Sequence, residues 1–184
     1  MNTFTDFVDC SKALCDQKYT SADRLFASGR SAGGLLMGAV ANMAPEQYKG
    51  IIAGVPFVDV LTTMSDPSIP LTTGEYSEWG NPANADEYNY MKQYSPYDNV
   101  KAQNYPNLLV LTSFADSQVQ YFEPAKWVAR LRDKKTDNNT LLFKTNMSGS
   151  HGGSSGRFEV LKERALEYSW MMGLLGMSGE MMKQ

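Results

Sequence analysis

Two apolar stretches constrain this sequence more than any other feature. Residues 50–55 and 108–112 are apolar almost throughout and lack polar alternation. Such runs are typical of strands that are buried on both faces, as they are in a parallel sheet. Parallel strands need long crossover connections, which are usually helices. The two stretches therefore predict an α/β domain.

The rest of the hydrophobic pattern supports this fold class. Further strands are expected at residues 24–28 and 141–144, and helices at 5–17, 35–41, 58–64, 85–94, 124–134 and 157–176. This alternation predicts a mostly parallel sheet flanked by helices, in one domain of 184 residues. The stretch 65–83 is rich in proline and glycine, and a long irregular loop of this kind is often functional.

Charge and cysteine content narrow the classes of partner. Seventeen basic and twenty acidic side chains give a net charge of −3 without a basic run, so we expect no nucleic-acid partner. Apolar stretches fall far short of the ~18 residues that span a membrane, so no membrane partner is expected. Cys10 and Cys15 fit no metal-site spacing. We therefore expect a cytoplasmic protein without metal or cofactor.

The pentapeptide from Gly29 to Gly33 matches G-x-S-x-G with Ser31 at its centre. It follows an expected strand and precedes an expected helix, the context in which this motif presents a serine nucleophile. The helix N-terminus would direct free N–H groups, beginning with that of Ala32, toward an oxyanion. The alternative interpretation is a glycine-rich turn with an inert serine.

A serine nucleophile needs a base and an acid that orients the base. His151, the sole histidine, follows the strand at 141–144 in a glycine-rich loop, and Asp116 follows the strand at 108–112. Taken singly, these residues could be a surface histidine and a turn-capping aspartate. The chain order Ser31, Asp116, His151 is nevertheless that of the α/β-hydrolases, with each member after a different strand.

Several longer segments resemble the C-terminal part of the catalytic domain in the oligopeptidase B group of the prolyl oligopeptidase family of serine peptidases. The resemblance runs from about residue 5 to about residue 175, and it rests on the segments 29–34, 55–60, 70–75, 94–100, 116–121 and 151–153.

The resemblance implies a partial α/β-hydrolase fold and a peptidase that cuts short peptides after arginine or lysine. Within it, Ser31 is the nucleophile, His151 the general base and Asp116 the residue that orients the base. Glu75 matches an acidic position that holds the basic side chain, and Phe57 matches a residue beside the same pocket. A second acidic position of bacterial members is Ser77 here, with Glu78 next to it.

The resemblance also identifies features that these 184 residues do not include. Family members carry an N-terminal β-propeller, and their hydrolase domain has further strands before the nucleophile. A tyrosine that completes their oxyanion hole belongs to that region, which leaves the Ala32 N–H here. The strand at 24–28 is central in the family's sheet, so we expect it to have an unpaired edge that favours self-association or a missing N-terminal portion.

Three functions remain open at this point. The first is a serine peptidase of the oligopeptidase B type, which the acidic residues Glu75 and Glu78 favour. The second is an esterase-like α/β-hydrolase with the same triad and no acidic pocket. The third is a truncated, non-catalytic remnant that binds a partner.

Overall fold

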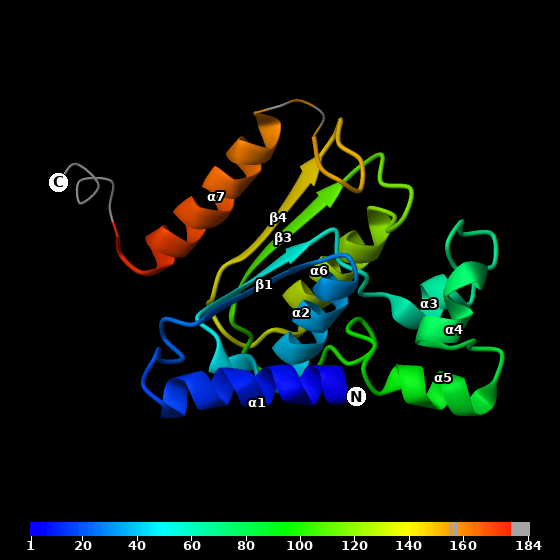
Figure 1. The fold of residues 1–184 in the computed structure, drawn as a ribbon, viewed down its shortest axis with the longest axis horizontal. Helices are drawn as coiled ribbons and strands as arrows, with labels where there is room; N and C mark the ends of the chain where they lie inside the picture. The colour runs from blue at the N-terminus through cyan, green and yellow to red at the C-terminus, as the bar shows by residue number, and fades with distance from the viewer. Residues whose placement is uncertain (155, 157, 178–184) are drawn as a thin grey trace.

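The computed structural model describes residues 1–154, 156 and 158–177. Its core is a four-stranded sheet in the order β1-β2-β3-β4, with every neighbouring pair parallel (Figure 1). The strands are β1 (Phe26–Arg30), β2 (Gly50–Gly54), β3 (Asn107–Ser113) and β4 (Leu141–Asn146). The longer helices are α1 (Asn2–Asp16), α2 (Ala32–Met43), α5 (Ala85–Lys92), α6 (Phe122–Lys134) and α7 (Glu159–Leu174), and the shorter ones are α3 (Val60–Met64) and α4 (Tyr76–Trp79). The predicted α/β class with a parallel sheet is confirmed.

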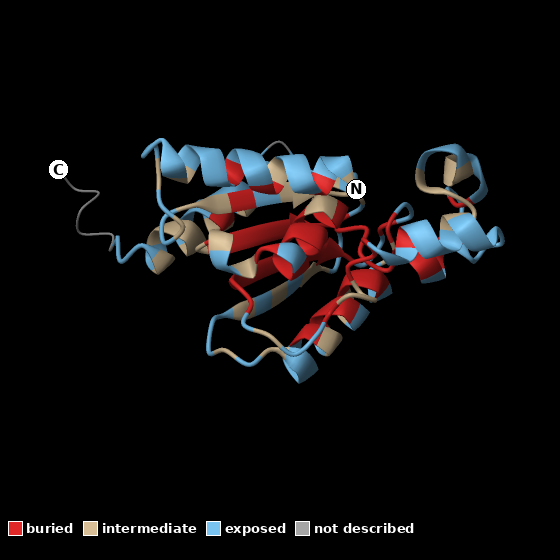
Figure 2. Cartoon of the chain, turned by 90° about the horizontal axis from the view of Figure 1, so that it is seen from below, coloured by how far each residue is buried: buried red, intermediate tan, exposed pale blue. Residues whose placement is uncertain are grey.

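Helices cover both faces of the two central strands, as the unalternated apolar runs predict. Ile51 of β2 and Leu108 of β3 belong to one core cluster, which α2 and α6 complete on one face. Ile52 and Leu109 belong to a separate cluster on the other face, packed against Trp170 of α7. Figure 2 shows the buried residues concentrated between the sheet and these helices.

The first strand differs from its predicted position by two residues. Gly29 was expected to end the strand, but it pairs with Ala53, and Arg30 pairs with Gly54. Gly29 is inside the strand because the next turn passes close to it. A Cβ there would lie 2.2 Å from the carbonyl oxygen of Gly33. The glycine makes room for the turn and does not interrupt the strand.

The stretch 65–83 is more ordered in structure than its composition predicts. It contains a 3-10 turn at Thr73–Glu75 followed directly by α4. Together with α3 and α5, this stretch forms a lobe to one side of the sheet, at the right of the view (Figure 1). Proline and glycine bend the chain here, but hydrogen bonds such as Glu75 N–H to the Leu71 carbonyl (3.2 Å) close local turns.

One edge of the sheet is β1, which pairs with β2 and with no other strand among the described residues. The unpaired edge expected for this strand is therefore present.

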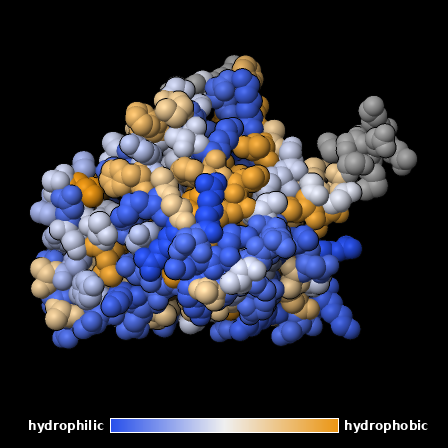
Figure 3. Space-filling view, turned by 180° about the vertical axis from the view of Figure 1, so that it is seen from behind, coloured by the Kyte–Doolittle hydropathy of each residue, from blue (hydrophilic) through white to orange (hydrophobic). Residues whose placement is uncertain are grey.

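On the far side of the molecule, apolar side chains gather mainly in the upper half of the view (Figure 3). Exposed apolar residues of α7 include Val160, Leu161 and Tyr168. Within the described part of the chain, no helix combines the length and the apolar character needed to cross a membrane.

Candidate active site

Ser31 occupies a strained turn between β1 and α2. Its backbone has φ 55° and ψ −119°, a conformation that is rare for residues other than glycine and that is typical of functional sites. The Ser31 N–H donates to the Gly54 carbonyl at 2.9 Å, and the Ser31 carbonyl accepts from the amides of Gly34 (2.8 Å) and Phe57 (3.2 Å). These bonds hold the turn at the carboxyl end of the sheet, in the predicted strand–turn–helix context.

The glycines around Ser31 do not contribute equally. A Cβ on Gly29 would overlap the Gly33 carbonyl, and a Cβ on Gly34 would lie 2.5 Å from the Cα of Pro56. Gly33, the last residue of the motif, has open space where its Cβ would be. The close approach of backbones therefore requires Gly29 and Gly34, and it does not require the second motif glycine, Gly33.

Asp116 and His151 come together from loops that follow β3 and β4. The Nδ1 atom of His151 lies 2.8 Å from Oδ2 and 3.1 Å from Oδ1 of Asp116. The Asp116 side chain is fully buried, and its Oδ1 also accepts from the amides of Gln118 and Val119, both at 2.9 Å. Three donors around one buried carboxylate fix its orientation, and the carboxylate in turn fixes the imidazole ring.

The loop that carries His151 is also fastened to the strand that precedes Ser31. Two hydrogen bonds between Ser150 and Gly153 close the loop, and Arg30 Nη2 donates to the His151 carbonyl at 3.4 Å. In the described structure, no hydrogen bond joins Ser31 Oγ to His151. Catalytic hydrogen bonds are often long before substrate binds, so this geometry is compatible with a nucleophile and its base.

A cavity of about 150 Å³ opens beside Ser31. Ala32, whose N–H is the first amide of α2 and lacks an intrahelical acceptor, lines it together with Ser31. The residues that the resemblance assigns to substrate binding, Phe57, Glu75 and Glu78, line it as well. Ser77 does not. The structure thus brings these five predicted site residues to one cavity.

The carboxylates give this cavity an acidic character. Glu75 is half-buried, and its Oε2 accepts from Trp79 Nε1 at 2.6 Å, which leaves Oε1 to meet a ligand. Glu78 is exposed to solvent. Phe57 packs edge-to-face on Trp79, with 5.6 Å between ring centroids. No lysine, arginine or histidine is among the described residues that line the cavity, so a cation would meet two carboxylates and apolar rings.

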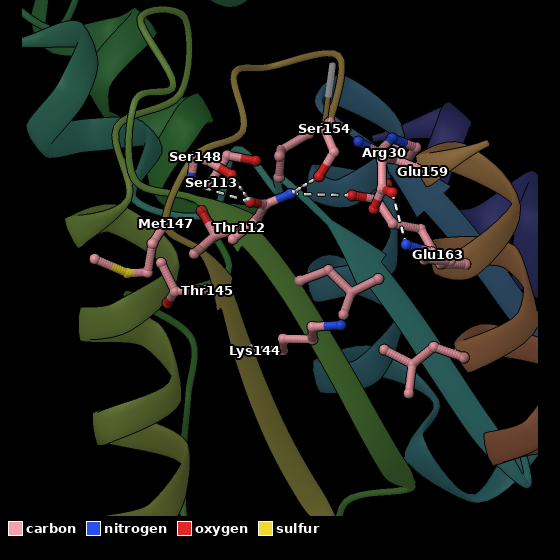
Figure 4. A pocket seen from close by; sticks show the side chains of 16 residues that line it. Arg30, Thr112, Ser113, Lys144, Thr145, Met147, Ser148, Ser154, Glu159 and Glu163 are labelled. Atoms are coloured by element: carbon pink, nitrogen blue, oxygen red, sulfur yellow. Dashed lines mark hydrogen bonds and ion pairs between the residues drawn. The ribbon is translucent and has the colours of Figure 1, made fainter. Parts of the chain in front are cut away.

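A larger cavity of about 360 Å³ is lined by residues of β3, β4 and α7, and by Ser148 and Ser154 from the loop after β4 (Figure 4). Charged residues of both signs line it, and Asn146 Nδ2 donates to Glu163 Oε1 across it at 3.3 Å. Asp116 and His151 line neither cavity, whereas Ser31 lines the smaller one and not this one. The smaller cavity is therefore the candidate substrate site.

Sequence reasoning missed two residues of this region. Arg30 occupies the variable motif position before Ser31, and nothing in the sequence indicates that it contacts the His151 loop. Glu123 reads as an ordinary acid in the first turn of a helix, yet it is fully buried, and burial raises its pKa from 4.5 to about 7. Pro124 after it is the sole hint, since it marks the helix start.

The chain matches the family described as the prolyl oligopeptidase family over residues 1–178. It is 59% identical over 179 residues to Protease 2 from Moraxella lacunata, covering 97% of this chain and 26% of that protein. It is 56% identical over 180 residues to dipeptidyl aminopeptidase BI from Pseudoxanthomonas mexicana, covering 98% and 25% of the two chains.

Solved structures agree with these matches. Oligopeptidase B from Leishmania major superposes with a TM-score of 0.94 at 51% identity, covering 96% of this chain and 24% of that one. Oligopeptidase B from Trypanosoma brucei with covalently bound antipain gives a TM-score of 0.93 at 48% identity, covering 95% and 25%. The chain thus spans about a quarter of the length of these relatives.

Proposed function

Because the chain belongs to the prolyl oligopeptidase family, we propose that it carries the catalytic site of a serine peptidase that cuts short peptides after arginine or lysine. The observation that carries this proposal is the hydrogen bond between the buried Asp116 carboxylate and His151 Nδ1, at the same carboxyl end of the sheet as the strained Ser31 turn. We further propose that residues 1–184 form part of an α/β-hydrolase domain whose first strands and β-propeller lie outside the sequence. The quarter-length coverage of the relatives supports this division.

The proposed reaction follows from the positions of these groups. His151 Nε2 takes the proton of Ser31 Oγ as Oγ bonds to the carbonyl carbon of the peptide. The Ala32 N–H donates to the oxyanion that forms. His151 then returns the proton to the leaving nitrogen as the C–N bond breaks, and water hydrolyses the acyl-enzyme by the same route. Asp116 keeps the Nδ1 proton of His151 in place throughout.

Specificity for a basic side chain is proposed from the acidic cavity. A guanidinium or ammonium group that enters it would pair with Glu75 Oε1 and with Glu78, while its aliphatic stem packs on Phe57. A neutral side chain would leave the half-buried Glu75 carboxylate unpaired. Charge complementarity of this kind discriminates more strongly than apolar contact does.

Active-site labelling tests the proposal directly. We expect a fluorophosphonate to label the folded chain at Ser31, as located by mass spectrometry of the peptide 24–43. Ser31→Ala should abolish the label, whereas the control Ser28→Ala, at an exposed position of the same strand, should keep it. A folded chain that shows no label would support a non-catalytic role. Equal rates of Ser31 labelling by a phosphonate with an arginyl side chain and by one with a neutral side chain would support the esterase function.

A further inference from the structure

Glu123 is a buried carboxylate that joins two parts of the candidate site. It belongs to the first turn of α6 and has no exposed surface. Its Oε1 accepts from the Asp59 backbone N–H at 2.8 Å, and its Oε2 accepts from Thr63 Oγ1 at 2.8 Å. A buried carboxylate costs free energy unless it is hydrogen-bonded, so both contacts constrain where the neighbouring chain can lie.

Both donors come from the segment that forms the cavity wall. Thr63 lies on α3 and lines the cavity, and its carbonyl accepts from Thr72 Oγ1 at 2.9 Å. The Thr72 carbonyl in turn accepts from the Glu75 N–H at 3.2 Å. A continuous hydrogen-bonded path therefore runs from Glu123 through Thr63 and Thr72 to the backbone of Glu75.

On its other side, Glu123 is connected to the loop of Asp116. Its N–H donates to the Gln120 carbonyl at 3.0 Å, within the segment that leads from Asp116 into α6. The amides of Gln118 and Val119 in that segment bind Asp116 Oδ1, and both residues line the cavity. Glu123 therefore stands between the acid that orients His151 and the wall that presents Glu75.

We propose that Glu123 is a positioning residue that fastens the acidic wall of the substrate cavity to the catalytic Asp116 loop and thereby sets the preference for basic side chains. This inference rests on the proposed function of the cavity. Glu123 does not line the cavity and acts through Thr63.

The charges around Glu123 make its ionisation sensitive to its surroundings. Asp59 lies close enough to repel the ionised form, and Lys126 pairs with Asp59 and lies 5.0 Å above the Tyr97 ring. Burial is the largest cause of the raised pKa of about 7, and the bonds from Asp59 N–H and the Thr63 hydroxyl oppose it. Ionised Glu123 accepts from both donors. When Glu123 is protonated, its own O–H donates to Thr63 Oγ1. The Thr63 hydroxyl hydrogen then turns away from Glu123.

Three variants separate a positioning role from a general loss of stability. Glu123→Leu removes both acceptors at similar volume. Glu123→Gln keeps an acceptor for the Asp59 N–H and offers an N–H to Thr63 Oγ1. Val128→Ala is the matched control, because Val128 is buried on the same helix and packs against the sheet away from the cavity.

The first measurement needs no catalysis, so it distinguishes failure of this inference from failure of the proposed function. We expect Glu123→Leu to speed amide hydrogen exchange at Asp59, Thr63 and Glu75 relative to the β3 amides. Val128→Ala should not change that ratio, and Glu123→Gln should restore it. Unchanged exchange at these amides in Glu123→Leu, or an equal change in Val128→Ala, would overturn the inference.

The second measurement compares labelling of Ser31 by an arginyl and a phenylalanyl diphenyl phosphonate. The ratio of the two rates cancels the shared dependence on His151. We expect Glu123→Leu to lower the arginyl preference about tenfold, with the control unchanged. In the wild-type chain the preference should rise with pH through about 7, and Glu123→Gln should remove that step. An arginyl preference that is the same in Glu123→Leu as in the wild type would also overturn the inference.

Discussion

Replacement of Glu123 by glutamine should change how the stability of the protein depends on pH. The pKa of Glu123 rises from 4.5 to about 7 when the chain folds. Its folded form therefore holds a proton that the unfolded form releases, so its contribution to stability is complete below pH 4.5 and is lost as the pH rises through 7. Each pH unit of the interval corresponds to about 1.4 kcal/mol, so the loss is about 3 kcal/mol.

The magnitude is large compared with typical domain stabilities of about 5–15 kcal/mol. Glutamine has no charge to bury and can still meet the Asp59 N–H and the Thr63 hydroxyl. Glu123→Gln should therefore match the wild type near pH 4.5 and exceed it by up to about 3 kcal/mol at pH 8. Urea unfolding at several pH values, followed by fluorescence, measures the difference.

A control variant makes this experiment specific. Val128→Ala weakens the same helix without removing a charge, so it should lower the stability without changing the slope of stability against pH between 5 and 8. If Glu123→Gln and the wild type give parallel curves across that range, the buried carboxyl does not titrate there, and the reasoning about its environment is wrong.

Four further predictions concern the candidate site and the sheet. Ser31→Ala and His151→Ala should each lower peptide turnover at least about a thousandfold without adding in the double variant, and additive losses would count against one catalytic unit. Glu75→Gln should raise KM for arginyl substrates about thirtyfold while a neutral ester changes little; equal effects on both would point to an esterase. Arg30→Met should slow labelling of Ser31 about tenfold because the His151 loop loses its tether, and an unchanged rate would show that the tether is dispensable. The isolated chain should self-associate through the β1 edge, and size-exclusion chromatography showing a monomer with well-protected β1 amides would refute this.

The sequence alone determined the fold class, and it supplied the side chains that we propose as the reactive ones. The apolar runs at 50–55 and 108–112 lack alternation because helices cover both faces of their strands, and this cause is local enough to be visible in the residues themselves. The G-x-S-x-G turn was identifiable for the same reason. Its strand, turn and helix are consecutive, so the Ser31 geometry needs no distant contact to be inferred.

Contacts between distant segments were decided by the tertiary structure. The closeness of Gly34 to Pro56 depends on how α2 and the loop after β2 pack, so the motif could not show that Gly34 is sterically required. Arg30 reaches a carbonyl 121 residues away. Glu123 looked like a solvated helix-start acid because an acid at that position favours the helix N-terminus in either environment. Tertiary packing buries Glu123 against the distant residues Asp59 and Thr63, and this burial raises the pKa of its carboxyl to about 7.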